Sequence, residues 1–268
     1  MSSSQILRGK HAVVFGAGGS IGTAVGKEMA AQGAEVFLAG RTKAKVEELA
    51  ANIAAGGGRV HAAVVDALDD GQVNEYLDRV AKEAGGIEAV FNAVGPRAAD
   101  YGNGKHAVDL RIEEFMVPAA TVLKSQFITA RAAARHMIKQ RSGVIIFLTG
   151  SPARGHVEGA TAIGAAFGAI ETLMENMAVE LGPAGVRVVC LRTTANVDSR
   201  SIQDTFDTLA SKMNVTKDQM IARMASLNFL KVPASVQDTA NAAVLVASDC
   251  ARMMTGTVLN CTAGAAAD

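Results

Sequence analysis

The 268-residue sequence contains no tryptophan and only two tyrosines, and it carries no excess of either charge. Lys and Arg together number 26, as do Asp and Glu, so no basic field is available to hold a polyanion, and we expect no nucleic-acid partner. No run reaches the roughly 18 apolar residues that a membrane-spanning helix needs. The N-terminus also lacks a charged segment followed by an apolar one. We therefore expect a cytoplasmic protein that does not associate with membranes.

Cysteine is scarce as well. The three cysteines are odd in number, which argues against a disulfide framework. Cys190 and Cys261 lie in apolar runs, where a thiol serves as a small hydrophobic group, and the third is Cys250. The histidines show no metal-ligand spacing, so we expect no metal site.

Seven short apolar runs indicate buried strands. They are His11–Phe15, Glu35–Ala39, Val60–Val65, Ile87–Ala93, Val144–Leu148, Val186–Leu191 and Thr257–Cys261. Between them lie stretches in which apolar residues recur at helical spacing, such as Ile21, Val25 and Met29. Parallel neighbours need crossover helices, and right-handed crossovers place those helices on both faces of a sheet. The alternation therefore predicts an α/β, doubly wound Rossmann fold with a seven-stranded parallel sheet.

The domain organisation follows from the even composition. No break in composition divides residues 1–268, so we expect a single domain with one large core. Residues 196–232 are richer in polar groups and methionine, and they interrupt the alternation before the last predicted helix. This segment fits a substrate lid or a plain helical insertion at the surface.

A glycine-rich segment marks the first strand-to-helix turn, where residues 16–22 read GAGGSIG. Glycines let the backbone turn tightly and approach a pyrophosphate, while the free N–H groups of a helix start form an anion site. The position between a strand and a helix makes the pattern informative. It predicts a dinucleotide-binding loop whose contacts come from Gly16, Gly18, Ser20, Ile21 and Gly22.

Five segments in order resemble the short-chain dehydrogenase/reductase (SDR) family. The glycine loop is similar to the family's Thr-Gly-x-x-x-Gly-x-Gly, with Phe15 and Ser20 as departures. The other four are Asp66-Ala67, Asn92-Ala93-Val94-Gly95, residues 178–188 and Thr255-Gly256. The resemblance covers about residues 10–264 and implies further cofactor contacts around the adenosine from Asp66, Ala67, Asn92, Ala93 and Gly95.

The end of the second strand selects between the two nicotinamide dinucleotides. An acidic residue there binds the ribose 2′-hydroxyl of NAD(H), whereas a basic one accommodates the 2′-phosphate of NADP(H). Here Gly40 stands where a carboxylate would, and Arg41 follows it. A guanidinium can bind a phosphate with two hydrogen bonds. We therefore expect NADP(H) rather than NAD(H), although Arg41 could also lie along a helix start and Gly19 lacks the second basic group of many NADP-dependent relatives.

The residues that perform the chemistry in the family are missing. SDR enzymes use Tyr-x-x-x-Lys on the helix after the fifth strand, a preceding Ser and often an Asn. Counting back from residues 178–181 places the Tyr position on Ile163, the Lys position on Phe167 and the Ser position on Gly150, and the Asn position falls on Val122. A general acid is typically worth about 10²–10⁴-fold in rate. The helix instead carries an apolar stripe, which indicates packing or the wall of an apolar pocket.

Polar replacements stand nearby, after the fifth predicted strand. His156 could donate a proton and Ser151 could bind a carbonyl group, although a single loop histidine is more often a solvated side chain. After the fourth strand, Arg97, Tyr101 and His106 are expected to face the same opening.

Three functions fit these observations. The first is a divergent NADP(H)-dependent oxidoreductase that acts on a small carbonyl or alkene substrate without the Tyr/Lys acid, since the nicotinamide itself carries the hydride. The second is a non-catalytic dinucleotide-binding protein, a sensor or an assembly partner. The third is a lyase or isomerase that uses the pocket without redox change.

The long helices beside the fifth strand suggest self-assembly. Residues 121–140 and 162–181 have faces rich in alanine and methionine, which a monomer would leave exposed. The family resemblance implies a homodimer or a homotetramer.

Overall fold

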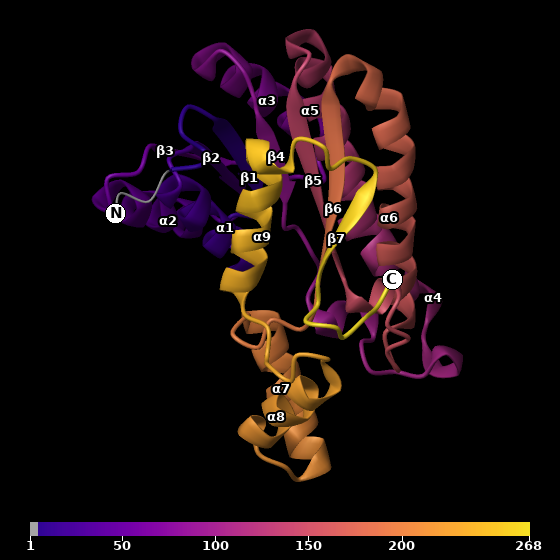
Figure 1. Ribbon diagram of the computed structural model, residues 1–268. Helices are drawn as coiled ribbons and strands as arrows, with labels where there is room; N and C mark the ends of the chain where they lie inside the picture. The colour runs from indigo at the N-terminus through magenta and orange to yellow at the C-terminus, as the bar shows by residue number, and fades with distance from the viewer. Residues whose placement is uncertain (1–4) are drawn as a thin grey trace.

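The sheet is the central layer of the molecule (Figure 1). The computed structural model describes residues 5–268, with the side chains of 5–206 and 214–268. Seven parallel strands lie in the order β3-β2-β1-β4-β5-β6-β7. They are β1 (His11–Phe15), β2 (Glu35–Gly40), β3 (Val60–Val64), β4 (Ala89–Asn92), β5 (Gly143–Gly150), β6 (Val186–Thr193) and β7 (Thr257–Cys261). The predicted strands and the doubly wound parallel sheet are confirmed.

Helices cover both faces of this sheet (Figure 1). On one face lie α1 (Ser20–Ala31), α2 (Lys43–Ala55) and α9 (Val236–Ala247). On the other lie α3 (Asp70–Ala84), α5 (Lys124–Gln140) and α6 (Thr161–Leu181). The strand order reverses between β1 and β4, and ligands of open α/β sheets bind where the strands end beside such a reversal.

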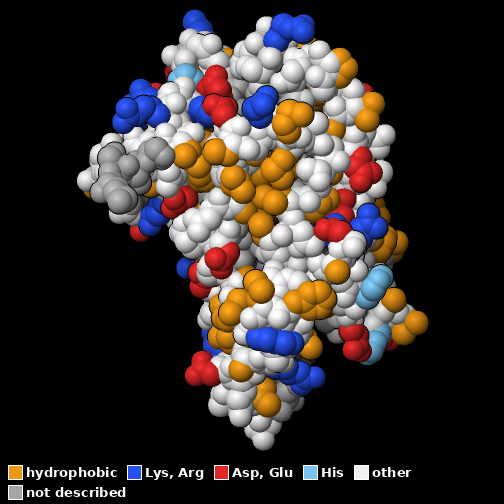
Figure 2. Space-filling view, viewed as in Figure 1, with side chains coloured by type: hydrophobic (Ala, Val, Ile, Leu, Met, Phe, Trp, Pro, Cys, Tyr) orange, Lys and Arg blue, Asp and Glu red, His pale blue; other side chains and the backbone are white. Residues whose placement is uncertain are grey.

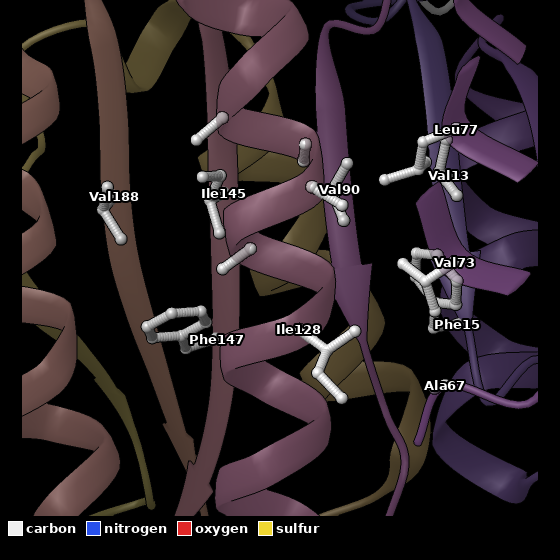
Figure 3. Close-up of a cluster of buried hydrophobic side chains, with 14 of the residues drawn as sticks. Val13, Phe15, Ala67, Val73, Leu77, Val90, Ile128, Ile145, Phe147 and Val188 are labelled. Atoms are coloured by element: carbon white, nitrogen blue, oxygen red, sulfur yellow. The ribbon is translucent and has the colours of Figure 1, made fainter. Parts of the chain in front are cut away.

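The core explains the apolar runs of the sequence. Figure 3 shows side chains of β1, β4, β5 and β6 gathered on the side of the sheet that α3 and α5 cover. Phe15 and Phe147 contribute the largest of these side chains, and both are fully buried. Alternate residues of the same strands face the second core under α1, α2 and α9. Because both faces are buried, these strands read as continuous rather than alternating apolar runs.

The helix expected over residues 121–140 begins differently in the structure. A short helix, α4 (Ile112–Pro118), runs into a π-helical turn, Ala119–Leu123, before α5 begins. Pro118 has no N–H to donate, and Thr121 Oγ1 donates to the Val117 carbonyl at 2.6 Å. The irregular turn includes Val122, the position at which the SDR resemblance places an asparagine.

Residues 196–232 form a helical pair that projects beyond the sheet, α7 (Arg200–Met213) and α8 (Lys217–Leu227) (Figure 1). The chain enters and leaves this pair at one point, since Asn196 pairs with Ala234 and the Val197 N–H donates to the Ala234 carbonyl at 2.9 Å. Among the described helices, none has the length and apolar character needed to cross a bilayer.

Candidate functional site

The turn between β1 and α1 depends on two glycines. Gly16 has φ +72°, and a Cβ there would lie 2.9 Å from both the Ala93 carbonyl carbon and the Val94 nitrogen. A Cβ on Gly22 would lie 2.3 Å from the Gly16 oxygen. Residue Gly19 caps α1 without a side-chain hydrogen bond, so the N–H groups of the first turn remain available to an anion.

A pocket of about 360 Å³ lies at the carboxyl edge of the sheet. It brings together three residues singled out from the sequence, Arg41, Asp66 and Gly95. Arg41 is exposed and has no hydrogen-bond or ion-pair partner among the described residues, whereas Asp66 Oδ1 accepts the Leu68 N–H at 3.0 Å. A Cβ on Gly95 would meet nothing within 4 Å, so the pocket is open at that point.

Other predicted cofactor residues lie outside the lining of this pocket. Asn92 is buried, where its amide donates to Thr129 Oγ1 at 2.9 Å and its Oδ1 accepts the Val94 N–H at 2.8 Å. Ala67 is buried in the core, and the Ala93 N–H donates to the Phe15 carbonyl at 3.0 Å. Ile21 packs against the opposite core. Among these residues, Asn92 fixes the turn after β4 through its bond to the Val94 N–H.

Apolar side chains occupy the positions at which the SDR resemblance places catalytic groups. A Cβ on Gly150 would lie 3.0 Å from Cε2 of the Phe167 ring, so this ring occupies the space beside Gly150 that a serine side chain would enter. Ile163, at the tyrosine position, is 7% exposed and belongs to the core under α6. The end of β5 and the start of α6 are therefore apolar at these positions.

The two polar candidates have different environments. Ser151 is buried at the end of β5, with its Oγ 3.4 Å from Thr194 Oγ1 beyond β6. His156 is exposed, has φ +49° and has no polar partner among the described residues. Ser151 thus lies at the strand ends where a substrate would be expected, and no contact links His156 to it in the described structure.

A buried charge network behind Ser151 was missed in the sequence. Arg192 of β6 and Glu171 of α6 are each 1% exposed and form two hydrogen bonds, at 2.8 and 2.9 Å. Thr149 Oγ1 donates to Glu171 at 3.1 Å, and Arg192 also donates to Asp268 near the C-terminus. Arg154 Nε, on the loop after Ser151, lies 3.4 Å from Glu171. The sequence did hold a signal, because Glu171 follows Phe167 by four residues and so lies on the same face of α6.

The electrostatics of this network follow from its contacts. The carboxylate of Glu171 raises the pKa of Arg192 above its usual value. The guanidinium of Arg192 in turn lowers the pKa of Asp268. Burial raises the pKa of the neighbouring Cys190 thiol to about 12, which keeps it protonated and unreactive at neutral pH.

Comparisons with known proteins give a consistent result. A family model described as enoyl-(acyl carrier protein) reductase matches residues 16–266. An uncharacterized oxidoreductase of Staphylococcus aureus is 28% identical over 186 residues, which cover 69% of this chain and 78% of the relative. A sorbitol-6-phosphate 2-dehydrogenase from Erwinia amylovora has a similar structure, with a TM-score of 0.87 and 23% identity over 96% of this chain and 100% of that one. A 7α-hydroxysteroid dehydrogenase in complex with NADH and a 7-oxo bile acid gives a TM-score of 0.85 at 23% identity, covering 98% and 97%.

Proposed function

The chain belongs to the short-chain dehydrogenase/reductase family of oxidoreductases, and on this basis we propose that it uses NADP(H) to reduce or oxidise a small carbonyl or alkene substrate without the family's Tyr/Lys acid. The observation that carries the proposal is the glycine turn at Gly16 and Gly22 beside the pocket that holds Arg41, Asp66 and Gly95. The turn leaves no room for side chains, and the pocket lies at the reversal of strand order.

The residues present fit a nicotinamide dinucleotide. Unpaired N–H groups at the start of α1 suit a pyrophosphate, and the open surface at Gly95 gives the adenosine half access to Asp66. Arg41, exposed and without a partner in the described structure, supports recognition of a ribose 2′-phosphate. When bound, the cofactor supplies the hydride.

The protein's own contribution to the reaction is positioning and exclusion of water. Phe167 and Ile163 make the start of α6 apolar, and the buried Ser151 hydroxyl, at the end of β5 and 3.4 Å from Thr194 Oγ1, is a polar group that can hold a carbonyl oxygen. This arrangement suits a substrate that needs little acid catalysis. His156, exposed and without contacts in the described structure, is the weaker candidate for a proton donor.

The alternative is a dinucleotide-binding protein without catalysis. The Phe167 ring over Gly150 favours it, because the catalytic position is occupied by packing rather than left vacant. Turnover distinguishes the two functions. A catalyst should oxidise NADPH with some activated carbonyl or alkene in a broad substrate panel, and a binding protein should bind NADPH without turnover.

The experiment that tests the proposal is a titration with NADPH and NADH, followed by that panel. We expect tighter binding of NADPH in the parent, the reverse order in Arg41→Asp, and lower turnover in Ser151→Ala. Equal binding of both cofactors before and after the Arg41 change would refute the role of Arg41. NADPH turnover unaffected by Ser151→Ala and His156→Ala would remove both residues as catalysts.

Self-assembly into a dimer or tetramer is also proposed. The alanine- and methionine-rich faces that the sequence led us to expect at the surface are buried in the core, as at Ala133, Met137 and Met174. The same two helices expose other apolar side chains, which are Phe127, Ile138 and Val179, the last to 78%. Figure 2 shows hydrophobic side chains gathered over the middle of the face on which α9 lies, a second apolar surface. Soluble monomers rarely leave such patches uncovered. Light scattering should return a dimer or tetramer at micromolar concentration, and a monomer would refute this.

A further inference from the structure

A buried guanidinium binds the segment that follows β7. Residues 262–268 leave the end of β7 and turn back toward α6 (Figure 1). Arg192 Nη1 donates to one oxygen of the Asp268 carboxylate, and Asn260 Nδ2 of β7 donates to the other at 3.0 Å. The Arg192 side chain is 1% exposed, whereas that of Asp268 is 54% exposed. We call the two donors, Arg192 Nη1 and Asn260 Nδ2, the β6–β7 anion site.

Other contacts hold both donors of this site in place. Arg192 directs its Nε and Nη2 to Glu171 at 2.8 and 2.9 Å, which leaves Nη1 to face the anion site. Asn260 Oδ1 accepts the N–H and the hydroxyl of Thr262 at 3.2 and 2.7 Å, and Asn260 Nδ2 also donates to the Ala266 carbonyl at 2.8 Å. The donors are therefore oriented by groups other than the carboxylate that they bind, and such preorganisation lowers the cost of binding a ligand.

The charges around the site balance only while an anion occupies it. Two guanidinium groups, those of Arg192 and Arg154, lie among two carboxylates, those of Glu171 and Asp268. The hydrogen bond from Arg192 lowers the pKa of Asp268, and the positive charge of Arg154 also lowers it. When Asp268 leaves the site, one positive charge is unbalanced and Arg192 Nη1 loses its acceptor. Both effects favour an incoming anion with a single charge.

The geometry of the site suits a carboxylate. One charged and one neutral N–H donor each take one oxygen of the same planar group, as Asp268 demonstrates. A hydrogen bond between a guanidinium and a carboxylate is among the stronger ones in proteins. Because more than half of the Asp268 side chain is exposed, a carboxylate from solution can reach the donors as Asp268 departs.

The occupant of the site also affects the loop that carries Ser151. Residues 265 and 266 pack on this loop, because a Cβ on Gly155 would lie 3.5 Å from both the Ala265 oxygen and the Ala266 Cβ. The Gly155 N–H in turn donates to the Ser151 carbonyl at 2.6 Å. Release of Asp268 from Arg192 therefore removes a restraint on the segment that packs against this loop.

We infer that the β6–β7 anion site binds a small monocarboxylate in exchange for Asp268, which is its internal ligand in this conformation. The exchange detaches residues 262–268 from Arg192 and loosens their packing on the loop after Ser151. The inference does not depend on the proposed use of NADP(H), because neither Arg192 nor Asn260 lines the pocket around Arg41.

The test is a calorimetric titration of the full chain with sodium acetate at constant ionic strength. Asp268→Ala should bind acetate about tenfold or more tightly than the parent, because a site that is open only about a tenth of the time loses that factor in apparent affinity. Acetamide has a similar shape without the charge, and it should bind to neither protein.

Asp249→Ala is the matched control, because Asp249 is also an exposed carboxylate that pairs with a cation. Its side chain is 87% exposed and lies 2.7 Å from Lys10 Nζ, on a lysine that is 20% exposed rather than fully buried. Removal of Asp249 should leave acetate binding within about twofold of the parent. The triple variant Asp268→Ala/Glu171→Leu/Arg192→Met removes the guanidinium together with the buried carboxylate that balances it, and it should bind no acetate.

Hydrogen exchange tests the release of the segment after β7. Peptides covering residues 151–158 and 262–268 should exchange faster in Asp268→Ala than in the parent. Saturating acetate should raise the exchange of both peptides in the parent toward the rates of the variant, and acetamide should leave them unchanged.

Each outcome decides the inference. Acetate that binds Asp268→Ala no more tightly than the parent refutes it, and so do equal gains in Asp268→Ala and Asp249→Ala, because the effect would then come from general charge. A triple variant that binds acetate as tightly as Asp268→Ala, or unchanged exchange in the parent saturated with acetate, also overturns it. The expected acetate results in a chain that binds no dinucleotide would support this inference and refute the proposed function alone.

Discussion

Replacing Arg192 with methionine should strongly destabilise the fold. The change leaves the Glu171 carboxylate, 1% exposed, with Thr149 and the long contact from Arg154 as its remaining partners among the described residues. Removing one member of a buried ion pair typically costs about 3–5 kcal/mol, because the remaining charge stays desolvated and uncompensated. We expect a loss of that size in the free energy of unfolding, measured by urea denaturation at neutral pH.

Two companion variants sharpen this prediction. Asp268→Asn should cost no more than about 1 kcal/mol, since the Asp268 side chain is 54% exposed and water can replace its partner. The double variant Glu171→Leu/Arg192→Met removes both charges together and should recover most of the loss, because paired apolar replacements are often close to neutral. An Arg192→Met variant within about 1 kcal/mol of the parent would refute the reasoning, and so would a double variant that costs the sum of Glu171→Leu and Arg192→Met.

Three further predictions concern glycines and a carboxyl group. Gly22→Ala places a Cβ 2.3 Å from the Gly16 carbonyl oxygen and should abolish NADPH binding or folding. Gly168→Ala in α6 is the control, because a Cβ there meets nothing within 4 Å, and it should stabilise the chain by up to about 1 kcal/mol in thermal unfolding. Gly150→Ser should cost about 1–3 kcal/mol by crowding the aromatic ring 3.0 Å away, and adding Phe167→Leu should restore much of it; equal stability of the two variants would contradict the crowding. Hydrogen bonds from Lys105 and Arg111 lower the pKa of Glu114 from 4.5 to about 2. The ionised Glu114 therefore contributes to the stability of the fold above pH 4.5, and this contribution is lost as the pH falls toward about 2. An NMR titration of Glu114 with a midpoint near 4.5 would contradict this.

The sequence predicted the strands and the turn that are determined by residues close together in the chain. Seven buried runs and the glycine turn are recognisable because strands buried on both faces need continuous apolar residues and a tight turn needs glycine. The predicted sixth strand ended at Leu191, however, and the strand continues through Arg192 to Thr193. Arg192 can be buried because it pairs with Glu171. Glu171 lies on α6 rather than on β6, so the sequence around the strand does not reveal the pair.

Some residues of the candidate site could also be placed from the sequence, whereas others depend on how distant elements pack. Arg41 and Asp66 follow strand ends and could be placed from strand positions alone, and they do line one pocket. The contact of Lys45 with Gly18 could not be placed, because it depends on how α2 packs across the glycine loop. Arg200 lies 180 residues after Ser20, and only the folded chain brings them together.

The packing of Phe167 on Gly150 also limits how the missing chemistry could return. A serine at 150 meets the ring, and a lysine at 167 would remove the ring packing and bring an ammonium to the helix face of Glu171, whose carboxylate Arg192 already holds. Each reversion is therefore harmful on its own, and a tyrosine at Ile163 would have neither neighbour to work with. A library of single substitutions should return no variant with restored acid catalysis. Recovery of acid catalysis requires several positions to change at once, so mutations that accumulate one at a time are not expected to restore it.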